Sequence, residues 1–417
     1  MKDLKEKRLE DYFRELVSMD VQEKDGDMWF AASNRNGIYR VNTENYEIVE
    51  KHRFEGEENS ECLLYHDMEI YGDRIFFAPH KAEKIAVYDV DSHEETYISL
   101  KPIEEKYRKS YLPTQKFAST FQDERYVYML GYTYPAIIKI DAETLEITYI
   151  DGWLEEIEKY TPKHISYGYF TMGNVKRGRK VLLPMGCICG LLELDLDTGE
   201  TKVICPAISM EGIGGIADDD NGNIWIVGRG IKPNIVARWN IQEDKYKEAE
   251  IPIDEGNCQV PFYEPLCYEG RVFLFPVYTN CAYEISVVDG QFKISRILES
   301  CVKERNRYSH LPMCTFSPRI IDGKIRFTTG QDGMWHIYHL ESGQIDDFYI
   351  VDDENVEACV WESMRRIFGQ SPNSVTAEGF YQLENFVDYV ISEKNERFVT
   401  NEEKVGKNIY YAAGGFR

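Results

Sequence analysis

The sequence predicts an all-β protein: a β-propeller of about seven four-stranded blades, with a short N-terminal helix and a helical C-terminal tail. Three observations predict this fold. A short apolar strand recurs every 43 to 54 residues, a turn signal precedes most copies, and a second alternating strand follows each copy after a loop. The recurrent strands are centred on Met28, Ile75, Val127, Val181, Ile224, Val272 and Ile325.

The turns and partner strands complete each repeat. Glycine and a polar residue precede the centre at 26–27, 72–73, 222–223, 270–271 and 323–324, and glycine tolerates the positive φ of tight hairpins. The partner strands begin at Gly37, Lys84, Ala136, Leu191, Ile235, Ala282 and Trp335. Units of this length suit four-stranded blades that pack only on their neighbours, so we expect a closed ring, with six or eight blades as the alternatives in counting.

Both ends of the chain carry helical patterns. Apolar residues spaced through 3–16 predict a short helix against the first blade. Apolar stripes at 356–367 and 383–391 predict two amphipathic helices joined by a linker at 369–379, and Thr400 with Glu403 forms a capping-box pattern for a third. We therefore expect an N-terminal helix (1–16), a propeller (17–351) and a helical extension (352–417) that packs on the ring or on a partner.

The charge and the cysteines exclude several function classes. The chain has 72 acidic and 48 basic residues and a net charge of −24, which disfavours nucleic acid and anionic membranes and leaves cationic or neutral ligands open. The first residues form no apolar leader and no long apolar run occurs, so we expect a cytoplasmic protein. Ten cysteines without paired CxxC spacing predict reduced thiols rather than a zinc site or disulfide framework.

The repeat resembles a known group of propellers. Its period and the D-x-x-T-G turn at Asp195 to Gly199 are similar to the YVTN, NHL and virginiamycin B lyase repeats, over roughly residues 17–351. The Trp-Asp and Gly-His pairs of WD repeats and the double glycine of kelch repeats are not regularly placed. The resemblance implies the ring architecture, and it implies binding of proteins, peptides, glycans or small molecules, with enzymes among its members.

Site residues of a propeller should recur at one register of the innermost strands. Eight residues before each strand centre lie Asp20, Asp67, Ser119, Gly173, Ile216, Glu264 and Ser317, with Gly214 or Gly215 as the alternative in the fifth repeat. The carboxylates of Asp20, Asp67 and Glu264 could share one level. There they would bind Ca²⁺ or Mg²⁺, raise one another's pKa, or simply be solvated.

The loop within each hairpin supplies a second set of candidates. These loops are rich in polar and aromatic residues suited to holding a polar ligand. The ligand-binding candidates are Asn34, Arg35, His80, Tyr132, Tyr134, His164, Arg229, Tyr278 and Gln331. Of these, His164 does not lie in a hairpin loop but before the predicted inner strand of the fourth repeat. His66, His164 and His310 fall at or before predicted inner strands and are candidate acids or bases.

Three functions fit these patterns. The first is a binding module that holds a peptide, glycan or small polar molecule, since no GxSxG, HExxH, P-loop or dinucleotide-binding motif occurs in a supporting context. The alternative is a divalent-cation-assisted lyase or lactonase-type hydrolase, implied by the resemblance, with His66, Asp67, Glu264 and His310 as catalytic residues and Asp20, Asp67 and Glu264 as metal ligands. A third is a structural or regulatory subunit that binds a protein partner through its C-terminal helices.

Overall fold

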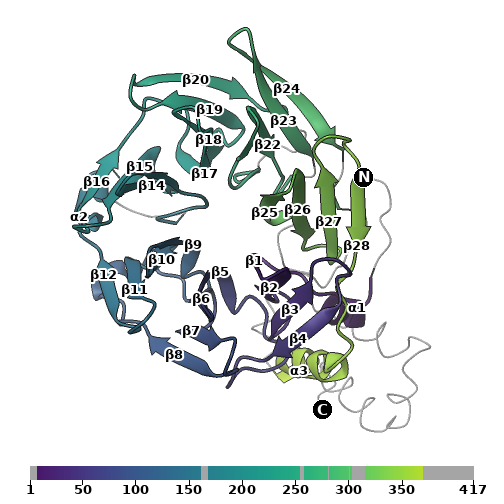
Figure 1. Ribbon diagram of the computed structural model, residues 1–417. Coiled ribbons are helices and arrows are strands. Elements are labelled where there is room, and N and C mark those ends of the chain that lie inside the picture. Colours follow the sequence, from purple (N-terminus) through teal and green to yellow (C-terminus); the bar gives the residue numbers. More distant parts are fainter. Residues whose placement is uncertain are drawn as a thin grey trace, which may run out of the picture.

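The computed structural model describes residues 7–160, 168–253, 258–279, 281–299, 301–302 and 315–369, with the backbone alone of residues 315–317 and 364–369. These residues form seven four-stranded antiparallel sheets, each built from consecutive strands and arranged as a ring (Figure 1). The predicted seven-bladed all-β propeller is therefore confirmed.

The blades follow one another in chain order. Blade 1 contains β1 (Gln22–Lys24), β2 (Asp27–Ala31), β3 (Ile38–Asn42) and β4 (Ile48–His52), and blade 2 contains β5 (Tyr65–Tyr71), β6 (Arg74–Pro79), β7 (Lys84–Asp89) and β8 (Glu95–Ser99). Blade 3 contains β9 (Phe117–Asp123), β10 (Tyr126–Gly131), β11 (Ile137–Asp141) and β12 (Ile147–Ile150), and blade 4 contains β13 (Val175–Arg177), β14 (Lys180–Met185), β15 (Gly190–Asp195) and β16 (Thr201–Ile204). Blade 5 contains β17 (Gly212–Asp218), β18 (Asn223–Arg229), β19 (Ile235–Asn240) and β20 (Lys245–Glu250). Blade 6 contains β21 (Leu266–Tyr268), β22 (Arg271–Leu274), β23 (Ala282–Val288) and β24 (Gln291–Leu298), and blade 7 contains β25 (Thr315–Ile321), β26 (Lys324–Thr329), β27 (Met334–His339) and β28 (Ile345–Phe348).

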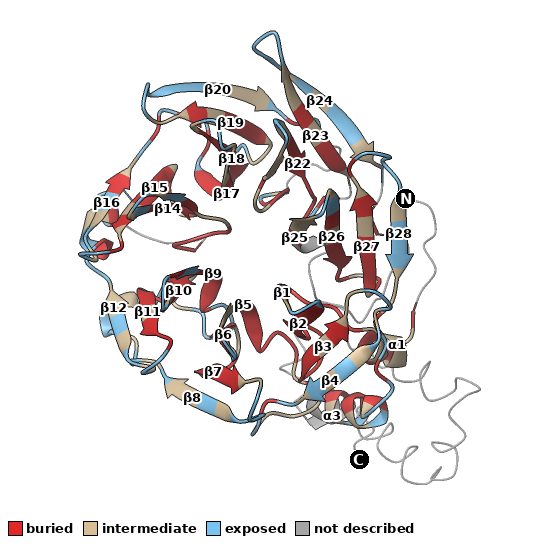
Figure 2. Ribbon diagram, viewed as in Figure 1, coloured by how far each residue is buried: buried red, intermediate tan, exposed pale blue. Residues whose placement is uncertain are grey.

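Burial falls from the second strand of a blade to the fourth, as Figure 2 shows. Every residue of β2 and β18 is buried, whereas β4 alternates between half-buried and exposed residues and β20 has no buried residue. The apolar runs recognised in the sequence are these second strands, because a strand covered by blades on both faces reads as continuously apolar.

Neighbouring blades are joined by large aromatic side chains. The ring centroids of Phe30 and Trp335 are 5.2 Å apart between blades 1 and 7, and those of Trp29 and Tyr88 are 6.1 Å apart between blades 1 and 2. Such pairs bury large apolar areas at a preferred separation, so they hold the blades together without any exchange of strands.

The ring closes where the two ends of the propeller meet. The backbone N–H of Leu16 donates to the carbonyl of Ile350 at 2.8 Å, and the N–H of Asp352 donates to the carbonyl of Arg14 at 3.0 Å. The indole Nε1 of Trp335 also donates to the carbonyl of Leu16 at 2.7 Å. The segment before blade 1 therefore pairs with the segment after blade 7.

Two terminal helices pack together beside this closure. They are α1 (Leu9–Arg14) and α3 (Val356–Gly369), and a shared core contains Leu9, Tyr12, Phe13, Val356, Cys359 and Val360. The first tail helix is confirmed. The N-terminal helix ends earlier than predicted, because Glu15 forms an extended bridge to Val351. The start of its predicted span, the linker and the other two tail helices lie outside the described residues.

Two short helical segments, the lack of a membrane-spanning helix among the described residues and the state of the cysteines complete the description of the fold. The structure contains a 3-10 turn η1 (Glu105–Tyr107) and a short helix α2 (Leu154–Ile157), which the sequence patterns did not predict. Across the described ranges, no helix combines the length and the apolar character needed to cross a membrane. The nine cysteines in those ranges are free thiols.

Candidate functional site

An irregularity repeated in the inner strands directs side chains toward one face of the ring. The pairing of β5 with β6 skips His66, the pairing of β9 with β10 skips Ala118, and the pairing of β17 with β18 skips Gly214. A residue inserted into one strand in this way bends the strand and re-aims the local side chain. Both His66 and Ala118 line the cavity described below.

In each of these strands, the residue that follows the inserted one occupies the inner-strand position that counting eight residues back from the strand centre predicted. These residues are Asp67, Ser119 and Gly215, so Gly215 rather than Ile216 takes the place in the fifth blade. A Cβ atom on Gly215 would lie 2.4 Å from the carbonyl oxygen of Tyr263. The close approach of neighbouring blades therefore requires glycine at this point.

The predicted carboxylates lie at this level with an arginine between two of them. Oδ1 of Asp20 lies 2.9 Å from Nη2 of Arg319, and Oε1 of Glu264 lies 3.7 Å from Nη1 of the same residue. Asp67 accepts hydrogen bonds from the backbone N–H groups of Met68 at 2.9 Å and Thr120 at 2.8 Å. Arg319 therefore links the first, sixth and seventh blades.

The pKa values of these carboxyl groups are shifted by their burial and by the charges and hydrogen bonds of their neighbours. Burial and the neighbouring charge of Asp20 raise the pKa of Asp67 well above its usual value. Burial opposes ionisation of Asp20 as well, but Arg319 and the hydrogen bond from Asp67 hold the pKa of Asp20 below its usual value. Burial also raises the pKa of Glu264, against the charge of Arg319. Of this acid pair, Asp67 is therefore the member that holds its proton more strongly.

This geometry does not fit the predicted metal site. The positive charge beside Asp20 and Glu264 is the guanidinium of Arg319, and both Asp67 oxygens are occupied by backbone donors. Among the residues that the structure describes, no group of three His, Cys, Asp or Glu side chains could hold a metal ion. The count of eight residues before each strand centre did not include Arg319, because Arg319 pairs with Arg326 and lies only six residues before the centre at Ile325, two residues from the counted Ser317.

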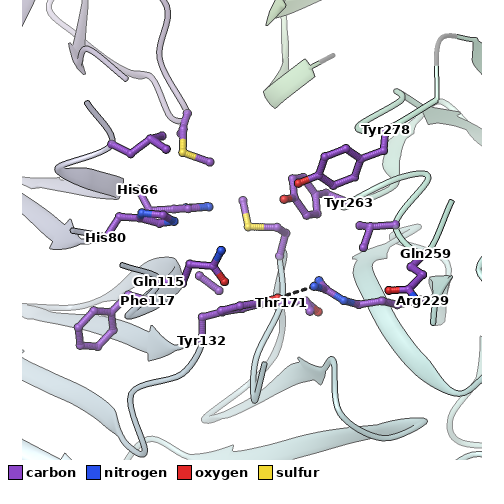
Figure 3. A pocket seen from close by; sticks show the side chains of 15 residues that line it. His66, His80, Gln115, Phe117, Tyr132, Thr171, Arg229, Gln259, Tyr263 and Tyr278 are labelled. Atoms are coloured by element: carbon purple, nitrogen blue, oxygen red, sulfur yellow. Dashed lines mark hydrogen bonds between the residues drawn. The ribbon is translucent and has the colours of Figure 1, made fainter. Parts of the chain in front are cut away.

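A cavity of about 380 Å³ opens among the hairpin loops next to this level (Figure 3). We call it the loop-face pocket. Its walls combine aromatic, aliphatic and polar side chains from several blades. The lining residues are Met19, Leu63, His66, His80, Gln115, Phe117, Ala118, Tyr132, Thr171, Met172, Arg229, Gln259, Val260, Tyr263 and Tyr278.

Arg229, at the end of β18, is the charged residue of the pocket wall. Its Nη2 donates to the hydroxyl of Tyr132 at 2.5 Å, and its guanidinium carbon lies 5.4 Å from the centroid of that ring. Only 6% of Arg229 is exposed, and its buried Nε has no hydrogen-bond partner. The guanidinium is thus oriented by Tyr132 and lacks a full set of acceptors.

Two histidines form part of the pocket wall opposite Tyr263 and Tyr278 (Figure 3). The rings of His66 and His80 stack with centroids 5.6 Å apart, and the buried Nδ1 atom of each lacks a hydrogen-bond partner. Burial lowers the pKa of His66 to about 4 against the charge of Asp20, and burial with the charge of His66 lowers the pKa of His80 well below its usual value. Both imidazoles are therefore neutral at pH 7.

The pocket brings together five of the candidates from the sequence: His66, His80, Tyr132, Arg229 and Tyr278. Four others lie elsewhere, since Asn34, Arg35, Tyr134 and Gln331 are not among its lining residues. Tyr134, for example, donates its hydroxyl to the carbonyl of Lys101 at 3.0 Å and stacks on Phe117. His164 and His310 lie outside the described residues.

Asn34 and Arg35 are buried beneath α1 instead of facing the pocket. Arg35 donates to the carbonyls of Phe13 and Asp352, each at 3.1 Å, and Asn34 donates to the carbonyl of Glu15 at 2.8 Å. Their role as ligand-binding residues was therefore predicted wrongly, because the polar loop that carries them is covered by the two ends of the chain.

The sequence reasoning missed Gln115, Gln259, Tyr263 and Arg319. Tyr263 directly precedes Glu264, one of the residues found by the eight-residue count, just as the pocket residue His66 directly precedes Asp67. Examining the residue before each counted position could therefore have identified Tyr263. Gln115 and Gln259 lie in connections between blades, where the repeat pattern gives no register.

The comparisons with known proteins show the fold alone. No protein-family model and no curated protein matches this chain. A streptogramin B lyase structure has a TM-score of 0.55 at 13% identity, over 80% of this chain and 95% of that chain. A catalytically inactive virginiamycin B lyase from Staphylococcus aureus with quinupristin has a TM-score of 0.54 at 14% identity, over 76% and 95%. The WD40 repeats of RRP9 have a TM-score of 0.52 at 10% identity, over 76% and 88%.

Proposed function

We propose that this propeller binds a small organic molecule in the loop-face pocket. The observation that carries the proposal is a cavity of about 380 Å³ whose wall holds buried polar atoms without protein partners. These atoms are Nε of Arg229 and Nδ1 of His66 and His80. Buried polar groups are normally hydrogen-bonded, so a ligand that bonds to them would remove an energetic cost.

The size and shape of the pocket favour a small molecule over a folded partner. Cavities of roughly 300 to 1,000 Å³ accommodate drug-sized ligands, and aromatic walls with a few polar groups are typical of them. A single sugar unit or a short peptide end remains within this class. Binding through a broad flat surface would not need the enclosed polar atoms.

The test is ligand-detected NMR with a library of small fragments. Gln259 is an exposed lining residue, so Gln259→Trp fills the pocket mouth without disturbing the core. Gln344→Trp is the matched control, because Gln344 is an exposed turn residue of the outer hairpin of blade 7. We expect fragments to bind the wild type and the control, and to bind Gln259→Trp at least tenfold more weakly. Equal binding to Gln259→Trp, or no fragment binding at all, would overturn the proposal.

An enzyme is the second candidate. The observation that favours it is the buried Nδ1 of His66, which has no protein partner in the pocket wall and could accept a proton from a bound molecule. Its pKa of about 4 makes this imidazole a weak base, so any such catalysis would be slow at pH 7. A cation-assisted reaction has no support from Asp20, Asp67 and Glu264, because Arg319 already supplies the positive charge beside Asp20 and Glu264 and backbone N–H groups bond to both oxygens of Asp67. Prolonged incubation of each bound fragment distinguishes the two functions: unchanged NMR signals indicate binding alone, and new product signals that disappear in His66→Gln indicate catalysis.

A further inference from the structure

We propose that the ligand of the loop-face pocket is a small monovalent carboxylate with a planar, largely apolar body, and that Arg229 binds its carboxylate group. This inference rests on the proposed function and specifies the chemical class of the ligand. It also departs from what the composition of the chain favours, because a net charge of −24 points to cationic or neutral ligands.

The first argument is the local charge of the pocket. None of the fifteen lining residues is Asp or Glu, although the chain contains 72 of them, and Arg229 is the lining residue with a permanent positive charge. No carboxylate therefore lines the cavity itself. A ligand in this cavity meets a cation and neutral dipoles rather than carboxylates.

The second argument is the lack of a counter-ion for Arg229. A guanidinium removed from water is normally paired with a carboxylate. Within the described ranges, the other arginine buried to this degree is Arg35, and it follows this rule, since its Nη2 lies 3.5 Å from Oδ2 of Asp352. Among the described residues, Arg229 has no carboxylate within ion-pair distance, and the partner that fixes it is the neutral hydroxyl of Tyr132. A bound carboxylate would supply the missing charge.

The third argument limits the charge of the ligand. The pocket offers one permanent positive charge, and the imidazoles of His66 and His80 remain neutral at pH 7. A phosphate carries nearly two negative charges at this pH, and no second cation lines the pocket to pair with the second charge, since Lys81 and Lys116 lie near His80 but not in the wall. A carboxylate carries one charge and matches the guanidinium geometry.

The fourth argument concerns the rest of the ligand. The remaining wall includes Phe117, Met172, Val260, Tyr263 and Tyr278, which present rings and aliphatic groups. Aromatic faces favour offset stacking with planar groups. The unpartnered Nδ1 atoms of His66 and His80 would hydrogen-bond to a further polar substituent.

The test compares carboxylates with their own amides, which have nearly the same shape and no charge. The pairs are phenylacetate with phenylacetamide and indole-3-acetate with indole-3-acetamide, measured by NMR titration against the full chain at pH 7. We expect the wild type to bind the carboxylate at least tenfold more tightly than the amide. Arg229→Gln should abolish this preference, and Arg229→Lys, which keeps the charge, should retain part of it.

Lys232→Gln is the matched control, because it removes one positive charge from an exposed position three residues away that does not line the pocket. It should leave the carboxylate preference unchanged. Equal loss in Lys232→Gln would mean that only the general charge of this face matters and would overturn the role of Arg229.

The outcomes also separate this inference from the proposed function. If the amides bind the wild type as tightly as the carboxylates and lose binding in Gln259→Trp, the pocket binds small molecules but the carboxylate inference is wrong. If inorganic phosphate competes with indole-3-acetate more strongly than acetate does, the ligand class is phosphate and the inference is also wrong. If neither series binds at millimolar concentration while other fragments of the library do, the carboxylate inference fails and the proposed function stands; if no fragment of the library binds either, both fail.

Discussion

Oδ1 of Asp20 lies 2.9 Å from Nη2 of Arg319, and this ion pair joins the inner edge of blade 1 to the inner edge of blade 7. The outer part of the same junction is closed by the backbone pairing of Leu16 with Ile350. The ring is thus closed twice, once by charge near its axis and once by backbone hydrogen bonds. The inner closure is sensitive to mutation, because the side chain of Asp20 is only 2% exposed.

Arg319→Met should destabilise the ring. Removing one partner of a buried ion pair leaves the other charge without compensation, which costs roughly 3–5 kcal/mol when both are buried. The side chain of Arg319 is 39% exposed, so we expect a smaller loss of about 2 kcal/mol in the free energy of unfolding, measured by urea denaturation at pH 7.

Lys24→Met is the control for this variant. Lys24 also joins two blades, through Oδ1 of Asp73 at 2.8 Å, but this pair lies on the surface. A surface pair contributes about 0–1 kcal/mol, so its loss should have little effect. Equal destabilisation by Arg319→Met and Lys24→Met would show that the inner ion pair has no special role.

Glu69 predicts a pH dependence of stability. Burial and the charge of Asp20 raise the pKa of Glu69 to about 7, whereas a glutamate in an unfolded chain titrates near 4.5. The folded state therefore binds an extra proton between these values, and this contribution to stability is lost as the pH rises from about 4.5 to about 7. Glu69→Gln removes the titration, so the variant should gain stability relative to the wild type between pH 5 and pH 8.

The measurement is urea denaturation of both proteins at several pH values. Glu94→Gln serves as the control for the loss of one negative charge, since Glu94 is exposed in an outer turn of blade 2. A constant difference between the wild type and Glu69→Gln across this pH range would contradict the raised pKa.

The fold was predictable because its pattern is local and repeated, whereas the site was predictable only in part. The apolar second strands, such as β2 and β18, recur at a regular spacing, and counting from them placed Asp20, Asp67 and Glu264 at one level. Arg319 was missed because it lies six residues before the strand centre Ile325 and pairs with Arg326, two residues away from the counted position. Arg35 was misassigned because its loop composition does not reveal that the chain ends cover it. A loop that is covered by distant segments of the chain shows no periodic pattern in the sequence, and neither does a single residue inserted into a strand.

The burial of Arg35 predicts that it holds the two ends of the chain on blade 1. Its guanidinium reaches the carbonyl of Phe13 at the end of α1 and the carbonyls of Asp352 and Glu354 before α3. In Arg35→Met these acceptors lose their donor and Asp352 loses an ion pair, so we expect about 3 kcal/mol of destabilisation. Hydrogen exchange of α1 and of residues 356–363 should accelerate before exchange of the blades.

Arg14→Met is the control for the terminal helices. Arg14 also connects the two ends, through Asp353 at 2.6 Å, but this pair lies at the surface, with Arg14 half-buried and Asp353 exposed. Its loss should change exchange rates little. Unchanged protection of α1 in Arg35→Met would show that the apolar contacts between α1 and α3 are sufficient to hold these helices.

The protonation of His66 gives the most direct test of the pocket geometry. Burial lowers its pKa to about 4, while an unfolded histidine titrates near 6.5. The native state must therefore bury a neutral imidazole, and the stability associated with this group is present above about pH 6.5 and is lost as the pH falls toward 4. In ¹H–¹⁵N spectra of the imidazoles, the His66 signals, assigned by their absence in His66→Gln, should not shift between pH 8 and pH 5. A midpoint near 6.5 would mean that water reaches the ring freely, and the pocket wall at His66 would then be open rather than enclosed.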